Sequence, residues 1–378
     1  MTVNRQRLAD TFQNLVRIDS ESKKESGVCD YIAGLFSELG AEIIIDNSQA
    51  RTGSDTGNLL ARFDGNDGLE PLVIGAHMDT VTPGRGIVPV FSDGVFTSQG
   101  ETILGSDDKS AIAIMYETMC VLRETGAAFC PLEWVFTVCE EIGLIGAKHF
   151  DFSLLRATSG YMLDAANPAG IVVQAPAANR LEFVVHGKDA HAGAHPEDGV
   201  NAISVAARAV ARLDPGRVDE ETTYNIGVIE GGQATNIVPP MVTIKGEVRS
   251  QRDEKLDSLT DRIVTVFRET VAEETERSRH EGFPYLEVSV VNDFKSFHIP
   301  SDHRVVKTAA RAARALGFDI VETVSGGGSD ANIFFQHGIT TGVLGTGMTD
   351  IHSVREKVAL DDMVRASELL IEIVKASS

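Results

Sequence analysis

Residues 71–79 read PLVIGAHMD, an apolar run of strand length that ends in an imidazole and a carboxylate. Two later runs are built in the same way, since PLEWVFTVCEE at 131–141 and GYMLD at 160–164 also finish with acidic residues. Stretches with apolar residues at helical spacing lie between the runs, for example SAIAIMYETMCVLRETG at 110–126. Short apolar strands that alternate with amphipathic helices predict an α/β fold, with a mostly parallel mixed sheet flanked by helices.

The order of elements changes between about residues 179 and 295. This segment is expected to form a strand, a helix, two strands, a helix and a strand, which together make a complete βαββαβ unit of ferredoxin-like type. The alternation of strand and helix resumes at about residue 296 and ends in a helix over MVRASELLIEIVKA. We therefore predict a discontinuous domain, residues 1–178 and 296–378, that carries an inserted domain at 179–295.

The chain is acidic, with 55 Asp and Glu against 34 Lys and Arg and a net charge of −21. This charge repels phosphate groups, so we expect no nucleic-acid partner and no membrane partner. No apolar run reaches the roughly 18 residues that a membrane span needs, and we find no signal peptide. The four cysteines form no CxxC pair and lie in or beside apolar segments, as buried free thiols do, so we expect a cytoplasmic protein.

The imidazole and carboxylate that end the first run are His77 and Asp79. They are two residues apart, so in an extended chain their side chains project from the same face. A carboxylate beside a metal-bound imidazole fixes its tautomer and raises its basicity. The alternative is an exposed pair at the end of a strand.

Two pairs of adjacent carboxylates follow. Asp107 and Asp108 precede Lys109 at the start of a helix, where capping and the helix dipole favour acidic residues in any case. Glu140 and Glu141 end a strand, and two adjacent carboxylates are costly to ionise together unless a cation lies near. A solvated acidic pair is the alternative for the glutamates.

Two further side chains complete this pattern. Asp164 closes the run GYMLD, and His352 lies in TDIHSVRE after the apolar run TTGVLG. Two histidines and three of these carboxylates would hold two divalent cations, because mixed nitrogen and oxygen ligands suit zinc, cobalt or manganese and one carboxylate can bridge. The joint occurrence of these groups predicts a two-metal site.

Nine motifs give the chain a family resemblance. From residue 75 to 356 they are GAHMDTV, GSDDKS, CEEIGLIGA, MLDA, GKDAHAGAHPEDGVNAI, GGQATNIVP, GEVRS, GGGSDAN and IHSVRE. In these stretches the chain resembles the M20-type co-catalytic metallopeptidases and deacylases, and it is most similar to the peptidase T-like branch. The resemblance implies a zinc-peptidase-like catalytic domain, with the insert as a lid and dimerisation domain.

The resemblance also implies roles for the metal-ligating residues, carried over one position at a time. Asp107 would bridge two cations, most often zinc in this family, with cobalt or manganese as alternatives. His77 and Asp164 would complete the shell of one cation. Glu141 and His352 would bind the other.

The neighbours of these ligands have implied roles as well. Asp79 would orient His77, and Glu140 would be the general base. The peptide bond after the bridging aspartate is often cis in this family, which would turn Asp108 aside.

In the insert, His191 matches a lid histidine that contacts the oxygen of the scissile carbonyl in relatives, from its own or a partner subunit. Asn236 and Arg249 match positions that grip the substrate, and Gly328 and Ser329 are candidate substrate contacts. A surface salt bridge is the alternative for Arg249. His195 has no implied role and is expected to be a surface-loop histidine.

The resemblance favours a metal-dependent aminopeptidase that hydrolyses di- and tripeptides, because an Asp at position 164 goes with aminopeptidase-type relatives. The lid reads AHAG, whereas an HPG-type turn is expected of peptidase T, so a strict tripeptide preference stays open. One alternative is an N-acyl amino acid amidohydrolase of the same family. Another is a non-catalytic regulatory protein, which would be expected to have lost a ligand or Glu140. We further expect a homodimer through the inserted domain.

Overall fold

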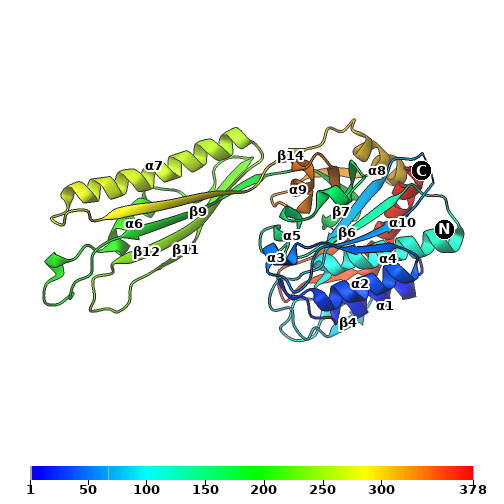
Figure 1. Cartoon of the computed structure of the whole chain (residues 1–378), viewed down its shortest axis with the longest axis horizontal. Helices are drawn as coiled ribbons and strands as arrows, with labels where there is room; N and C mark the ends of the chain where they lie inside the picture. The colour runs from blue at the N-terminus through cyan, green and yellow to red at the C-terminus, as the bar shows by residue number, and fades with distance from the viewer. Residues whose placement is uncertain (1, 67, 378) are drawn as a thin grey trace. The chain divides into compact units, whose positions relative to one another are not determined.

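The computed structural model describes residues 2–66 and 68–377, which form two compact units (Figure 1). Unit 1 comprises Met1–Gln174, His298–Ser325 and Ser329–Ser378, and unit 2 comprises Ala175–Phe297 and Gly326–Gly328. The three glycines at 326–328 belong to unit 2, whereas the sequence predicts them to be part of the discontinuous domain. The reason is a close approach of backbone to ring, since a Cβ on Gly328 would lie 2.4 Å from the Phe294 ring.

A large mixed sheet forms the centre of unit 1, in the order β1-β2-β6-β3-β7-β16-β8-β14, with β15 beside β8. Strands β6, β3, β7 and β16 are parallel to their neighbours in this series, whereas β1, β2 and β8 add antiparallel pairs. The predicted fold class is confirmed. The strands are β1 (Glu42–Ile45), β2 (Leu59–Phe63), β3 (Leu72–His77), β6 (Leu132–Thr137), β7 (Ser159–Ala165), β8 (Gly170–Ala175), β14 (Phe297–His298), β15 (Val321–Val324) and β16 (Thr340–Gly345).

Helices flank this sheet. Helix α4 contacts β3 and β7 and packs against α1 and α10, while α9 contacts β16. Helix α8 buries Val305, Val306, Ala309, Ala312 and Ala313, which recur at helical spacing, so one apolar stripe faces the core. The helices of unit 1 are α1 (Arg5–Val16), α2 (Ser26–Glu38), α3 (Gln49–Thr52), α4 (Ser106–Thr125), α5 (Ile145–Lys148), α8 (Arg304–Ala315), α9 (Asp330–Gln336) and α10 (Leu360–Ala376).

A small second sheet in unit 1 was not predicted. Its order is β17-β18-β5-β4, with β4 (Pro89–Ser92), β5 (Val95–Ser98), β17 (Met348–Thr349) and β18 (Lys357–Ala359). These strands have two to four residues each, too few to show a hydrophobic period in the sequence. The pairing of β18 with β5 brings the segment after His352 beside the segment that precedes α4.

Unit 2 is an antiparallel sheet with two helices against it. The sheet order is β10-β11-β12-β9-β13, which is the ferredoxin-like order for the predicted βαββαβ unit with a short extra strand at one edge. Helices α6 and α7 both contact β9 and β12, and their apolar faces form a core with the sheet. The elements are β9 (Ala177–His186), α6 (Ala202–Ala211), β10 (Gly216–Arg217), β11 (Thr222–Gly231), β12 (Met241–Ser250), α7 (Asp253–Arg277) and β13 (Tyr285–Phe294).

In unit 1, polar residues gather at the carboxyl ends of the parallel strands of the main sheet. Strand β3 ends at His77, which lies opposite Thr137 at the end of β6. Asp164 lies near the end of β7, the other neighbour of β3. Because parallel strands place their carboxyl ends on the same side, residues far apart in sequence meet there.

None of the helices that the described residues form is long and apolar enough to cross a bilayer.

Candidate metal centre and active site

The first candidate metal group comprises His77, Asp107 and Asp164, whose ligand atoms all lie within 4.8 Å of one another. His77 Nε2 lies 2.9 Å from Asp107 Oδ1, and His77 Nδ1 lies 2.9 Å from the carbonyl oxygen of Asp79. A carbonyl oxygen can only accept, so Nδ1 carries a proton and donates it to this bond. In a neutral ring Nε2 therefore has its lone pair free for a cation.

The second candidate metal group comprises Asp107, Glu141 and His352. His352 Nε2 lies 3.0 Å from Glu141 Oε2 and 3.2 Å from Asp107 Oδ2. Asp107 thus belongs to both groups, with Oδ1 toward His77 and Oδ2 toward His352. One carboxylate placed in this way can bridge two cations.

The electrostatics of the two groups fit the binding of cations. Burial, together with the negative charge of Asp107, raises the pKa of Asp164 well above its usual range. Hydrogen bonds with Asp107 and Glu141 raise the pKa of His352 to about 10. Burial opposes ionisation of Asp107, but hydrogen bonds from His352 and His77 outweigh it and lower its pKa. The metal-free site therefore holds protons where divalent cations would supply the compensating charge.

Residues 73–376 match the model of peptidase family M20/M25/M40. The chain belongs to this family. It is accordingly a metal-dependent peptidase, which confirms the predicted class of enzyme.

Solved structures and curated relatives of this M20 chain cover its whole length. The aminopeptidase PepT of Bacillus cereus is 39% identical, with 99% of both chains covered and a TM-score of 0.88. A tripeptidase of Staphylococcus aureus is 36% identical, with 100% of this chain and 99% of that chain covered and a TM-score of 0.92. The uncharacterised Bacillus subtilis protein YqjE is 38% identical over the whole of both chains. These likenesses confirm the peptidase T-like branch.

Asp79 is buried, and its carboxylate chiefly holds the segment that bears the two glutamates. Oδ1 accepts from the backbone N–H of Glu140 at 2.9 Å, and Oδ2 accepts from the N–H of Glu141 at 3.2 Å and from the Ser22 hydroxyl at 2.6 Å. The distance from Asp79 Oδ1 to His77 Nδ1 is longer, 3.5 Å. The ring of His77 is thus oriented mainly by the backbone carbonyl of Asp79, where the sequence suggested its carboxylate.

Glu140 lies beside the metal groups but belongs to neither of them. Its side chain is buried, and this burial, together with the charges of Asp164 and Asp330, raises its pKa well above the usual range. A carboxylate that gains a proton readily, and that lies next to cation ligands, has the properties of a general base and acid.

Asp108 adjoins the shared ligand but takes a different direction. The Asp107–Asp108 peptide bond is cis, as the family resemblance led us to expect. Asp108 Oδ2 accepts from the backbone N–H of His77 at 3.2 Å, and burial raises its pKa well above the usual range. Asp108 therefore contacts the backbone of a candidate ligand and belongs to neither metal group.

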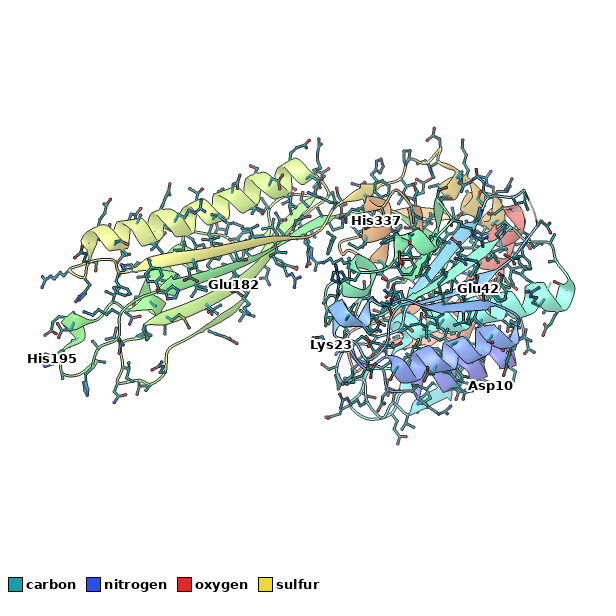
Figure 2. The ribbon with its side chains drawn as sticks, in the orientation of Figure 1. Asp10, Lys23, Glu42, Glu182, His195 and His337 are labelled. Carbon is teal, nitrogen blue, oxygen red and sulfur yellow. The ribbon has the colours of Figure 1, made fainter. Side chains whose placement is uncertain are left out.

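In unit 2, the loop of His191 and the loop of Asn236 lie side by side. The N–H of Ala192 donates to the carbonyl oxygen of Asn236 at 2.9 Å, and His191 forms an isolated β-bridge with Ile237. His195 follows in an exposed loop, with 69% of its side chain accessible, which confirms its prediction as a surface histidine (Figure 2).

The remaining predicted substrate residues have structural partners. Arg249 Nε lies 2.9 Å from Glu247 Oε1, so the salt bridge considered as an alternative does form. The Nη1 atom of Arg249 also donates to Gly326 O at 3.4 Å. Gly328 lies against the Phe294 ring, as described above. Ser329 is the N-cap of α9, and its N–H donates to Asn332 Oδ1 at 3.0 Å.

Two buried carboxylates near the site were not assigned by sequence reasoning. Glu25 accepts from the N–H of Cys139 at 3.0 Å, directly before Glu140. Asp330 accepts a hydrogen bond from Thr137, and burial raises its pKa to about 6. Asp330 lies within the quoted motif GGGSDAN, so an acidic residue at a helix start was the available signal, whereas nothing in the sequence marks Glu25.

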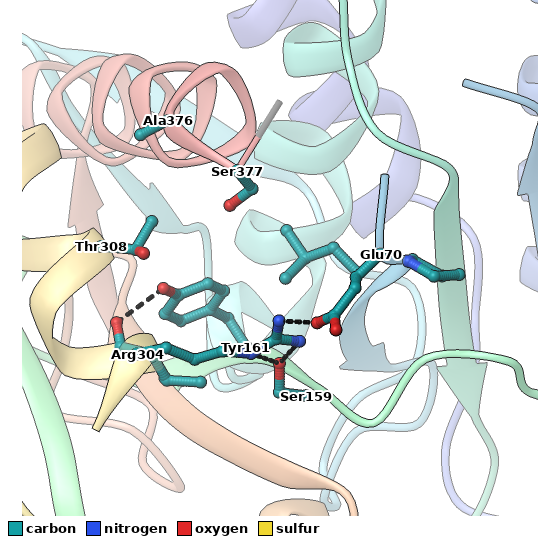
Figure 3. A pocket seen from close by; sticks show the side chains of 10 residues that line it. Glu70, Ser159, Tyr161, Arg304, Thr308, Ala376 and Ser377 are labelled. Atoms are coloured by element: carbon teal, nitrogen blue, oxygen red, sulfur yellow. Dashed lines mark hydrogen bonds and ion pairs between the residues drawn. The ribbon is translucent and has the colours of Figure 1, made fainter. Parts of the chain in front are cut away.

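A separate cavity of about 210 Å³ lies at the amino ends of β3 and β7 (Figure 3). Its lining includes Glu70, which precedes β3, and Ser159, the first residue of β7. Arg304 forms an ion pair with Glu70 and donates to the Ser159 hydroxyl, and the Tyr161 hydroxyl donates to Val305 O at 2.7 Å. These polar groups satisfy one another, so we assign this cavity no role.

Proposed function

We propose that this chain is an aminopeptidase that hydrolyses di- and tripeptides at a two-cation site. The observation that carries the proposal is the sharing of Asp107 between two ligand groups, with Glu140 beside them and outside both. The named activities of the Bacillus cereus aminopeptidase and the Staphylococcus aureus tripeptidase, each more than a third identical to this chain, support the substrate class.

His77, Asp107 and Asp164 would hold one cation, and Asp107, Glu141 and His352 the other. This set of imidazole nitrogens and carboxylate oxygens suits zinc, with cobalt or manganese as substitutes. When bound, the cations would polarise the scissile carbonyl and lower the pKa of an attacking water.

Glu140 would accept a proton from that water and return it to the departing amine. The Asp79 carboxylate accepts from the backbone N–H groups of Glu140 and Glu141, and these hydrogen bonds would hold the base and the neighbouring ligand in fixed positions.

His191 would donate a hydrogen bond to the carbonyl oxygen as negative charge develops on it. The Nδ1 atom of His191 accepts from the N–H groups of Gly193 and Ala194, at 3.2 and 3.1 Å. A neutral ring with Nδ1 as acceptor carries its proton on Nε2, which makes Nε2 the donor that this role requires. We propose Asn236, Arg249, Gly328 and Ser329 as substrate contacts; Arg249 could grip a peptide carboxylate only if it exchanged Glu247 for it.

The inserted domain would also join two chains. Residues Thr223 and Tyr224 of β11 pair with β10, so among the described residues most of this strand is an open edge, and β13 forms the other edge of the sheet. Val228, Ile229, Val290 and Val291 are exposed on these two strands. Open edges with exposed aliphatic residues favour pairing with a second copy, which sedimentation velocity would detect as a dimer.

The substrate is tested with a panel of di-, tri- and tetrapeptides that have free or acetylated N-termini. The protein is loaded with Zn²⁺, Co²⁺ or Mn²⁺, and Glu140→Gln serves as the inactive control. We expect metal-dependent release of N-terminal residues from free-amine di- and tripeptides. Hydrolysis of N-acetyl amino acids without hydrolysis of free-amine peptides would favour the amidohydrolase alternative instead.

A further inference from the structure

Glu356 is a buried carboxylate, 1% exposed, that has no role in the mechanism proposed above. Its Oε2 accepts from the backbone N–H groups of Leu104 and Gly105, both at 2.8 Å. Its Oε1 accepts from the Ser106 hydroxyl at 2.6 Å and from the backbone N–H of Asp107 at 3.0 Å. One side chain thus binds four consecutive residues that end at the shared candidate ligand.

The segment that contains Glu356 also contains His352, a member of the second metal group. His352 lies four residues before Glu356, in a turn that is held by three hydrogen bonds. In this turn the Ser353 hydroxyl donates to Asp350 O at 2.7 Å, and the N–H groups of Arg355 and Glu356 donate to Ser353 Oγ and O at 3.2 and 3.0 Å. The turn and the carboxylate together fix the segment of His352 against the segment of Asp107.

We propose that Glu356 is a positioning residue that sets the separation of the two ligand segments and thereby the affinity of both cation sites. This inference rests on the proposed two-cation function. Glu356 bonds directly to the N–H of Asp107, so loss of that bond displaces a ligand of both groups. It acts through Asp107 and His352 and is not itself a ligand in either group.

The role requires a carboxylate. Four donors converge on the two oxygens of Glu356, two on each. A glutamine supplies one oxygen only, so its NH₂ group would face either two backbone N–H groups or one backbone N–H group and the Ser106 hydroxyl, which can turn to accept. In either orientation at least one buried backbone N–H loses its acceptor. A buried N–H without an acceptor is unfavourable, and the loop must therefore move away.

The test compares Glu356→Gln with Glu133→Gln in the full-length protein. Glu133 is the matched control, because it is also fully buried and accepts from the backbone N–H groups of Arg156 and Ala157. Its position in β6 is near the amino end of the strand, away from the candidate ligands. Zn²⁺ affinity is measured by competition with a chromophoric chelator, and the Co²⁺-substituted proteins are compared by visible absorption.

We expect Glu356→Gln to weaken Zn²⁺ binding about 10- to 100-fold and to change the Co²⁺ spectrum, as loss of partners of metal ligands does elsewhere. Glu133→Gln should lower thermal stability but keep Zn²⁺ affinity within about threefold, because distant sites act independently. Wild-type Zn²⁺ affinity and Co²⁺ spectrum in Glu356→Gln would overturn the inference.

A milder pair of variants covers the case in which Glu356→Gln does not fold. Ser106→Ala removes one donor to Glu356, and Ser367→Ala is its control, since the Ser367 hydroxyl donates within α10 to Met363 O at 2.9 Å. Ser106→Ala should weaken Zn²⁺ binding by about tenfold, the lower end of the effect of one hydrogen bond to a charged group, and equal affinities in both variants would overturn the inference.

Failure of the proposed function gives a different result. In that case the wild type binds no divalent cation tightly, or His352→Ala leaves Zn²⁺ affinity unchanged. A wild type that binds two cations, together with a Glu356→Gln variant that binds them equally well, removes only the role of Glu356.

Discussion

The substitution Asp79→Asn separates two possible duties of this carboxylate, orienting His77 and holding the Glu140 segment. The native carboxylate accepts three hydrogen bonds, from the Ser22 hydroxyl and from the N–H groups of Glu140 and Glu141. Asparagine has the same shape but one acceptor oxygen, so its NH₂ group must face at least one of these donors. The variant therefore loses at least one bond to an ionised acceptor.

The size of the effect follows from that count. A hydrogen bond to a charged group contributes about 1.5–3 kcal/mol. Since 1.36 kcal/mol corresponds to a tenfold change in rate, displacement of Glu140 should lower kcat by about 10- to 150-fold. The content of bound metal should stay at the wild-type level, because His77 Nδ1 keeps its bond to the backbone carbonyl of residue 79 at 2.9 Å.

The assay measures kcat and KM on trialanine together with metal content by inductively coupled plasma mass spectrometry. Ser22→Ala is the control, because it removes one donor and leaves both backbone bonds of Asp79 in place. Its kcat should fall much less than that of Asp79→Asn, because the bonds that position the Glu140 and Glu141 segment both remain. Wild-type kcat in Asp79→Asn, or loss of metal as its main defect, would refute the reasoning.

Three further predictions concern single groups. Glu140→Gln should lower kcat by about 10²- to 10⁴-fold at unchanged Zn²⁺ content, and near-normal turnover of the loaded variant would contradict its role as base. The pKa of His352 is raised to about 10 from 6.5, so the stability it adds to the metal-free fold is present below its unfolded pKa and lost as the pH rises toward 10. Cation binding must displace this proton, so Zn²⁺ affinity should increase between about pH 6 and pH 9, and titration calorimetry that shows no proton release would disprove this. Gly328→Ala should destabilise the protein by about 1–3 kcal/mol through overpacking against Phe294, whereas a Cβ on Gly326 meets nothing within 4 Å, and equal melting temperatures of the two alanine variants would show the clash to be harmless.

Much of the fold could be predicted because its strands carry strong local signals. The runs LVIGAH and LEWVFT form β3 and β6 and are buried throughout, as expected for strands inside a mostly parallel sheet. The βαββαβ pattern of the insert likewise appears in order along the chain. The strands β4, β5, β17 and β18 escaped prediction because they are very short, and because the pairing that joins the two hairpins, β18 with β5, links distant segments.

The candidate site divides in the same way. The side chains suited to metal binding were visible because charged groups at the ends of apolar runs are unusual, and the structure gathers five of them into two groups. The partners that hold these side chains were not visible. Glu356 lies some 250 residues from the loop that it binds, so no local pattern links the two.

The sequence by itself determined the types of candidate ligand, the attachment of His77 and Asp164 to strand ends and the family, because these depend on residue identity and local periodicity. Only the tertiary structure decided which oxygen of Asp107 faces which histidine, and that the backbone carbonyl of Asp79 is the closer partner of His77 Nδ1. The physical reason is that hydrogen bonds depend on distances of a few tenths of an ångström between atoms. Such distances are fixed only when the parallel strands and their loops pack together.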